Sequence, residues 1–117
     1  MTSKFFEEQF EIYHKSFVNQ SLDEAIEEIN GAMEYSIKYN EEKGKPYMRY
    51  LLGFGGPNIS INMYTDDITF SFGWWYHREV SLKGTQNYDD LWDLYGYEAK
   101  EDIKILMEDC EDLWLNS

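Results

Sequence analysis

The stretch from Pro46 to Leu82 constrains the fold of this chain more than any other. It holds three runs of alternating apolar residues, separated by the sequences GGPN at 55–58 and TDD at 65–67. Short alternating runs between turn-forming residues are typical of an antiparallel meander. Residues 80–82 either extend the third run or form a short fourth strand. We therefore expect three or four consecutive antiparallel strands.

Side chains alternate across a strand, so each run has two faces that can be read by parity. One face is strongly apolar and the other is largely polar. The expected apolar face consists of Met48, Tyr50, Leu52, Phe54, Ile59, Ile61, Met63, Ile68, Phe70, Phe72, Trp74 and Tyr76. Trp75 and His77 then lie on the polar face, near Arg49, Tyr47 or Tyr64. A sheet of this kind packs helices on its apolar side, which gives a two-layer sandwich.

Two helices are expected before the meander. Ser3 caps the first helix, in which one face holds Phe6, Phe10, Tyr13 and Phe17 at helical spacing. Ser21 and Glu24 have the spacing of a capping box and begin the second helix. We expect this second helix to continue to Lys43, because its apolar spacing persists through the weak point at Asn30 and Gly31.

Two further helices are expected after the meander. Asn87 caps a short helix from Tyr88 to Tyr95 that ends at Gly96. A final helix from Ala99 places one apolar face toward the core, formed by Ile103, Leu106, Met107, Cys110, Leu113 and Trp114. The order ααβββ(β)αα predicts one α+β domain over residues 1–117, with N-terminal and C-terminal helices packed on one face of the sheet.

The formal net charge of −13 is unevenly distributed along the chain. Residues 1–45 hold 5 lysines and 10 acidic residues, residues 46–86 hold 3 basic and 3 acidic residues, and residues 87–117 hold 2 lysines and 10 acidic residues. The negative charge therefore lies on the flanking segments, and the meander is neutral. Binding to a nucleic-acid backbone requires the opposite sign, so we expect no direct nucleic-acid partner.

We expect the acidic helix faces to bind a protein that has a basic, nucleic-acid-binding groove. A helix over 99–115 spaces its acids along about 25 Å, which imitates in sparser form the charge line of duplex DNA. Trp75 and His77 add an aromatic anchor of the kind found at interface hot spots. The predicted partner-binding residues are Asp23, Glu24, Glu27, Glu28, Trp75, His77, Glu101, Asp102, Glu108, Asp109, Glu111 and Asp112. The alternative is that the carboxylates only keep an aromatic-rich protein soluble.

No residue set predicts a catalytic, cofactor-binding or metal site. The two histidines, His14 and His77, lack the short spacings of metal-binding motifs. Cys110 lies on an apolar stripe between two acids, a setting that disfavours a reactive thiolate and predicts a structural role. An alternative from another class is a small enzyme in which His77 and Glu79, on one face of a strand, act as acid and base.

The chain carries no sign of a membrane or secretory location. No apolar run approaches the length of about 20 residues that spans a bilayer, and the first residues lack the pattern of a signal peptide. A single cysteine excludes an internal disulfide. We expect a soluble cytoplasmic protein without a membrane partner, and the sequence leaves the oligomeric state open.

The sequences LLGFGGPN at 51–58 and GWWYH at 73–77, in a short acidic chain, resemble small proteins of phages and mobile elements. Among these proteins are anti-CRISPR and antirestriction inhibitors. The resemblance implies an inhibitor of a bacterial defence nuclease, such as a CRISPR effector, acting in the host cytoplasm. It assigns no binding residue, because such inhibitors have many unrelated folds. The alternatives are an immunity protein that neutralises a basic toxin nuclease and a structural domain that oligomerises through the polar sheet face.

Overall fold

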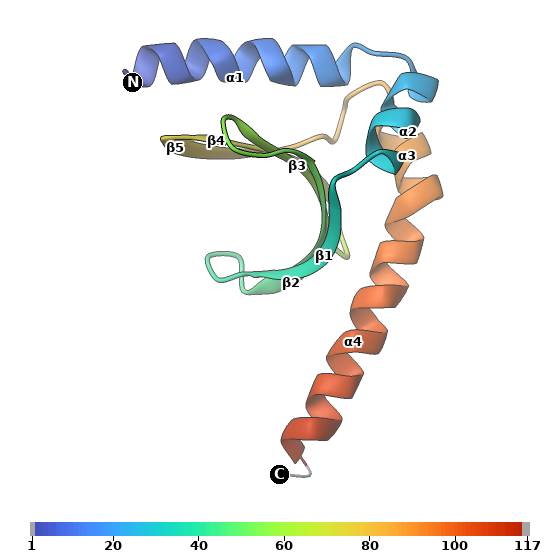
Figure 1. The fold of residues 1–117 in the computed structure, drawn as a ribbon. Coiled ribbons are helices and arrows are strands. Elements are labelled where there is room, and N and C mark those ends of the chain that lie inside the picture. The colour runs from blue at the N-terminus through green and yellow to red at the C-terminus, as the bar shows by residue number, and fades with distance from the viewer. Residues whose placement is uncertain (1, 116–117) are drawn as a thin grey trace.

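The computed structural model describes residues 2–115, and the side chains of residues 2–108. Two helices precede a single antiparallel sheet and a long helical segment follows it, so the fold is α+β as expected (Figure 1). The strands are β1 (Glu34–Asn40), β2 (Lys45–Gly53), β3 (Asn58–Met63), β4 (Ile68–Trp74) and β5 (Tyr76–Ser81).

The five strands follow one another in the sheet in the order β1-β2-β3-β4-β5, and every neighbouring pair is antiparallel. The meander predicted from the sequence is therefore confirmed, with a separate fourth strand at its end. The sheet is strongly curved, and the helices lie against its convex side (Figure 1). Its concave side is open, and this curvature determines which polar side chains meet.

The first strand corrects the sequence prediction, which placed residues 34–43 in a helix. The second helix ends at Asn30 with Gly31 as its C-cap, and the chain then turns into β1. The error has a physical reason: Ile29, Met33 and Ile37 recur every fourth residue, as on a helix, whereas Tyr35, Ile37 and Tyr39 alternate, as on a strand. Met33, which directly precedes β1, is exposed.

The helices are α1 (Ser3–Val18), α2 (Leu22–Asn30), α3 (Tyr88–Leu91), the π-helical turn η1 (Trp92–Gly96) and α4 (Tyr97–Leu115). The first cap is Thr2 rather than Ser3, because the Thr2 hydroxyl accepts the N–H of Phe5 at 3.2 Å. The capping box of α2 is confirmed by the bond that Ser21 accepts from the N–H of Glu24 at 3.2 Å.

The core lies between the helices and the convex face of the sheet, and it includes Leu91 of α3 and Ala99 and Ile103 of α4. Its centre is aromatic: Phe10 contacts Phe70 and Phe72 edge-on, with ring centroids 5.9 Å apart in each case. The parity rule placed both sheet residues on this face correctly, and both are buried. Tyr13 also contacts Phe72 but remains partly exposed, so this third member of the predicted helical stripe lies at the edge of the core.

The C-terminal segment differs from the two separate helices that were expected. Gly96 does not end a helix; it lies within η1, which joins α3 to α4 without a break. A Cβ atom at Gly96 would come within 2.4 Å of the Trp92 ring, so glycine here permits the indole to lie against the backbone. A π-helical turn has one more residue per hydrogen-bonded turn than an α-helix, so the apolar spacing shifts at η1 although the helix continues. The sequence prediction took this shift for the end of one helix and the start of another.

Candidate functional site

The acidic residues of α2 lie on an exposed surface. Four of them were predicted to bind a partner, namely Asp23, Glu24, Glu27 and Glu28, and all four side chains are exposed. Glu24 also accepts the Ser21 hydroxyl at 3.1 Å, and Glu28 accepts the Gln20 amide at 2.9 Å. Two of the four therefore have local hydrogen-bond partners in addition to their exposure.

The acidic residues that follow the sheet lie on the adjacent helical segment. Asn87 donates to the carbonyl of Gln20 at 3.0 Å and the Tyr95 hydroxyl donates to Asn30 at 2.8 Å, which holds α3 and η1 beside α2. Beyond these contacts, Glu101 and Glu108 of α4 are exposed. The side chains of Asp109, Glu111, Asp112 and Cys110 lie outside the described residues.

Asp102 has a structural contact that the sequence did not predict. Its carboxylate accepts the hydroxyl of Tyr35 at 3.0 Å, which attaches α4 to β1. Burial raises the pKa of Tyr35, and the nearby Tyr50 and Asp102 act in the same direction, so the phenol remains a donor. Asp102 is half-buried and less available to a partner than Glu101 or Glu108.

The acids of α2 and of residues 88–108 outnumber the basic residues of these segments, which are Lys100 and Lys104. Among the described side chains, every ion pair is formed by residues of α1, of the strands, or of the β1–β2 and β3–β4 turns. None of these ion pairs includes an acid of α2 or of residues 88–108. Residues 34–81 hold five basic and six acidic residues, so the sheet is close to neutral. The described acidic surface is therefore a helical one on the convex side of the molecule.

Trp75 forms the reversal between β4 and β5. The sequence placed it within a strand on the polar face, but β4 ends at Trp74 and β5 begins at Tyr76, so this prediction was wrong. Trp75 has φ of +69° and its side chain is 80% exposed. A bulky residue at positive φ is rare, and such strain concentrates at functional sites.

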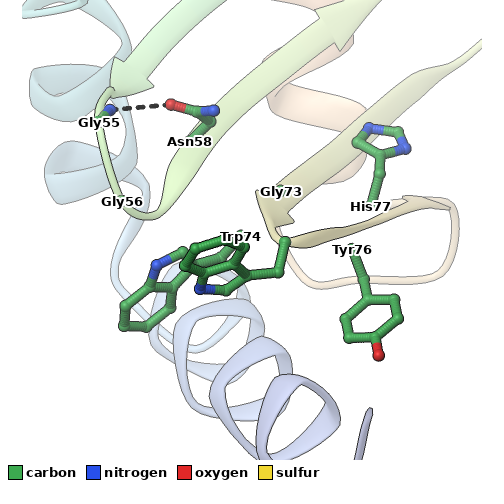
Figure 2. A pocket seen from close by; sticks show the side chains of 8 residues that line it. Gly55, Gly56, Asn58, Gly73, Trp74, Tyr76 and His77 are labelled. Atoms are coloured by element: carbon green, nitrogen blue, oxygen red, sulfur yellow. Dashed lines mark hydrogen bonds between the residues drawn. The ribbon is translucent and has the colours of Figure 1, made fainter. Parts of the chain in front are cut away.

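An open hollow of about 520 Å³ lies beside this reversal, between the β2–β3 loop and the start of β5 (Figure 2). Gly56 contributes to one wall, where a Cβ atom would lie 3.2 Å from the indole nitrogen of Trp74. Asn58 accepts the N–H of Gly55 at 2.9 Å and holds the loop. A strand follows these glycines, so they form a turn and not the phosphate-binding entry to a helix.

His77 is one of the residues that line this hollow, and it points to the concave face of the sheet, opposite to Tyr76 (Figure 2). Its Nε2 atom is 2.8 Å from the hydroxyl of Ser71 on β4. His77 and Glu79 share one strand face, as expected, but the structure joins His77 to Ser71 by a hydrogen bond. Ser71 gave no sequence signal, because a serine on a strand has the appearance of ordinary surface.

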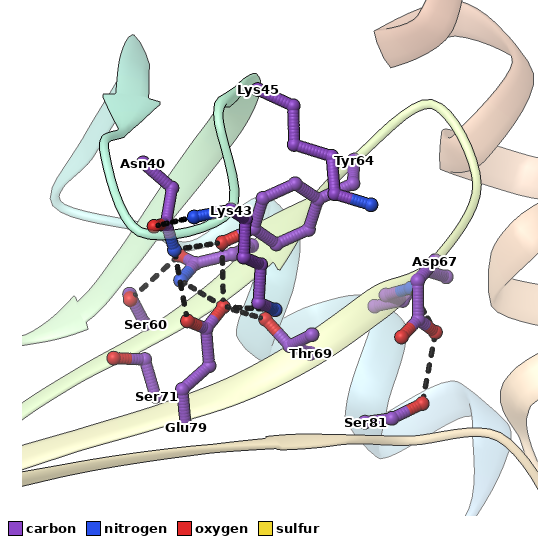
Figure 3. Close-up of polar contacts among 12 residues, drawn as sticks. Asn40, Lys43, Lys45, Ser60, Tyr64, Asp67, Thr69, Ser71, Glu79 and Ser81 are labelled. Carbon is purple, nitrogen blue, oxygen red and sulfur yellow. Dashed lines mark hydrogen bonds and ion pairs between the residues drawn. The ribbon is translucent and has the colours of Figure 1, made fainter.

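The carboxylate of Glu79 is the centre of a hydrogen-bond network on the concave face (Figure 3). Its side chain is only 11% exposed, and it accepts bonds from Tyr64 at 2.8 Å, Asn62 at 3.2 Å and Thr69. Burial alone would raise the pKa of Glu79, but these bonds and the ammonium of Lys43 outweigh burial and lower it. Glu79 is therefore a carboxylate at neutral pH.

The same network connects the β1–β2 turn to β5 across the open side of the sheet. Asn40 donates to the Tyr64 hydroxyl at 3.0 Å, and Lys43 lies 3.8 Å from Glu79 and over the ring of Tyr64. The curvature of the sheet brings these distant strands together, and it encloses a polar hollow of about 250 Å³ that includes Arg49 and His77. The alternation of side chains in the sequence predicted that these residues share the polar face of the sheet. It did not predict that the β1–β2 turn contacts β5 across that face.

No group of three or more histidine, cysteine or acidic residues suited to a metal occurs among the described residues. In the same part of the chain, no helix is long and apolar enough to cross a membrane. The chain matches no family model, no curated protein and no solved structure, so the functional argument rests on its own geometry.

Proposed function

We propose that this protein is an inhibitor that binds the basic, nucleic-acid-binding groove of an enzyme through its acidic helical surface. The observation that carries the proposal is the exposed, unpaired acidic surface of α2 and the adjoining segment 88–108. Most of its acids face solvent, and none of them forms an ion pair among the described side chains. They outnumber Lys100 and Lys104, the two basic residues of this surface, and the sheet that supports them is nearly neutral. This segregation favours a surface with a specific task over charge spread for solubility alone.

The dimensions of α4 support a groove as its complement. The 19 residues of this helix extend for about 28 Å at a rise of 1.5 Å per residue. Duplex DNA carries about one charge per 1.7 Å of its axis. The acids of α4 are likewise arranged along one axis, but with wider spacing between the charges. A bacterial defence nuclease is the partner class that this proposal favours. A basic toxin nuclease neutralised by an immunity protein is the alternative partner with the same electrostatics.

The hydrogen-bond network around Glu79 on the concave face favours a binding protein over an acid/base enzyme. The proposed base partner, Glu79, accepts hydrogen bonds from three neighbours and attracts Lys43, so its oxygens are already used. The contact between Ser71 and His77 is the one observation that favours a catalytic alternative, since a hydroxyl beside an imidazole is the arrangement of an activated nucleophile. Partner binding that persists in the Ser71→Ala variant, with no hydrolase activity in the native protein, excludes that alternative.

A pair of charge-reversal variants tests the proposal. Glu101→Lys with Glu108→Lys alters α4, and Glu41→Lys with Glu42→Lys alters the exposed β1–β2 turn by the same total charge. For a partner captured from bacterial lysate, we expect the α4 variant to associate at least about ten-fold more slowly at low salt. The turn variant retains most of the native rate. Equal losses in both variants would show that net charge alone, and not this surface, controls association.

A further inference from the structure

We propose that the hollow beside Trp75 is a binding site for an arginine side chain of the partner protein, with the guanidinium group stacked on the Trp75 indole. The inference rests on the proposed function in one respect only, the basic character of the partner. The hollow lies at the loop end of the sheet, between the β2–β3 loop and the β4–β5 reversal. It is therefore separate from the acidic helical surface and adds a contact of different chemistry.

Trp75 is presented to solvent and does not pack in the core. Its backbone is in the left-handed region at φ +69°, and four-fifths of its side chain is exposed. Its neighbour Trp74 has the opposite environment, because it packs against the core and lies 6.1 Å from the ring of Phe5. The reversal thus keeps one indole in the fold and leaves the other uncovered.

The lining of the hollow suits a planar cation. Its aromatic groups come from Trp74, Trp75, Tyr76 and His77. Gly55 and Gly56 of the β2–β3 loop, and Gly73 near the end of β4, leave the backbone there without covering side chains. No lysine, arginine or carboxylate lines the hollow, and its ionisable side chains are those of Tyr76 and His77. Indole is the most favourable aromatic face for a cation, and the guanidinium group stacks flat and is weakly hydrated.

The net charge of the chain argues for this occupant and against two others. A protein with a formal charge of −13 attracts basic partners over long distances. It repels a nucleic acid, whose bases would otherwise stack on an exposed indole. It also repels a second copy of itself, which carries the same charge.

Capped tri-arginine and tri-lysine peptides test the site without any knowledge of the partner. Both peptides carry the same charge and respond equally to the acidic helices, but only arginine can stack. Titrations followed by the indole N–H signals in NMR, with Trp75 assigned from the Trp75→Leu variant, report binding at this residue. We expect tri-arginine to bind about two- to five-fold more tightly than tri-lysine, with the largest shift at Trp75.

Variants separate the site from the fold and from the acidic surface. Trp75→Leu keeps an apolar side chain without a π-face, so it removes the preference for arginine, whereas Trp75→Phe retains part of it. The variant Glu101→Lys with Glu108→Lys weakens both peptides and preserves their ratio. If the proposed function is wrong and no partner with a basic groove exists, the native protein still binds tri-arginine more tightly than tri-lysine. An error in the proposed function can therefore be distinguished from an error in this inference.

Three results would overturn the inference. The first is equal affinity of the two peptides for the native protein. The second is a preference for arginine that Trp75→Leu leaves unchanged. The third is a Trp75 signal that shifts with protein concentration in the absence of peptide, which would make a second copy of this chain the occupant.

Discussion

Replacement of Glu79 by glutamine tests whether the network on the concave face depends on a charge. Glutamine preserves the size of the side chain and one oxygen that can accept hydrogen bonds. It removes the negative charge that Thr69, Tyr64 and Asn62 bond to and that Lys43 faces at 3.8 Å. It also directs an amide group toward the donor atom of Asn40, which lies 3.5 Å from the second carboxylate oxygen.

The expected magnitude follows from these contacts. A hydrogen bond to a charged acceptor is about twice as strong as a neutral one, so each of the three bonds loses roughly 0.5–1.5 kcal/mol when the charge is removed. The three losses are not fully additive, and the weak Lys43 pair adds little. We expect the free energy of unfolding to fall by about 2–3 kcal/mol at pH 7, and Tm to fall by roughly 8–12 °C for a chain of this length.

The effect also has a definite pH dependence. Because the folded protein holds the pKa of Glu79 below its ordinary value of 4.5, the charge stabilises the fold fully above that pH. The stabilisation is lost as the pH falls through the folded-state pKa. The difference between native protein and Glu79→Gln is therefore large at pH 7 and smaller at pH 3.

Urea unfolding at both pH values measures this difference. Glu27→Gln is the matched control, since Glu27 is exposed, and we expect it to change the free energy of unfolding by less than about 0.5 kcal/mol. Equal effects of the two variants at pH 7 would refute the reasoning. So would a Glu79→Gln deficit that is undiminished at pH 3.

Three further predictions concern the two loops and α4. Trp75→Asn relieves backbone strain of about 1–2 kcal/mol and loses a similar amount of apolar burial, so we expect the free energy of unfolding, measured by thermal unfolding, to change by less than about 1 kcal/mol. Trp74→Ala removes a ring that is packed on the core, and we expect it to lower the free energy of unfolding by about 3 kcal/mol. Gly56→Ala introduces a side chain at φ +153° and 3.2 Å from the Trp74 nitrogen, and we expect a loss of about 1–3 kcal/mol in urea unfolding, whereas Gly53→Ala, at an ordinary φ, should lose less. Tyr35→Phe removes the bond to Asp102 and should increase amide hydrogen exchange at the start of α4, with a loss of about 1 kcal/mol; unchanged exchange would show that this bond does not hold α4 to β1.

The meander could be predicted from the sequence because its period is short and its turns have clear chemistry. The alternation of Phe70 and Phe72 with Thr69 and Ser71 indicated the apolar face, and the GGPN sequence indicated a turn. The strand β1 could not be predicted in the same way. Ile37 continues the four-residue spacing of Ile29 and Met33, so a helical pattern overlaps the strand alternation of Tyr35, Ile37 and Tyr39.

The site was predicted in part. Parity placed His77 and Glu79 on one polar face, and the exposed acids of α2 and α4 follow directly from helical spacing. The contact of Asn40 with Tyr64 and Glu79 depends on the curvature of the whole sheet, which no local pattern encodes. The reversal at Trp75 lacks the glycine, asparagine or aspartate that marks a positive-φ turn, so nothing in the sequence distinguished it from a strand.

Competition by DNA tests the central claim most directly. The tagged protein is used to capture partners from bacterial lysate at low salt, and a short DNA duplex is then used for elution before mass spectrometry. We expect the duplex and moderate salt each to release a nucleic-acid-handling enzyme, because DNA and the acidic helical surface occupy the same basic groove. A specifically captured partner that neither DNA nor salt releases would contradict the account.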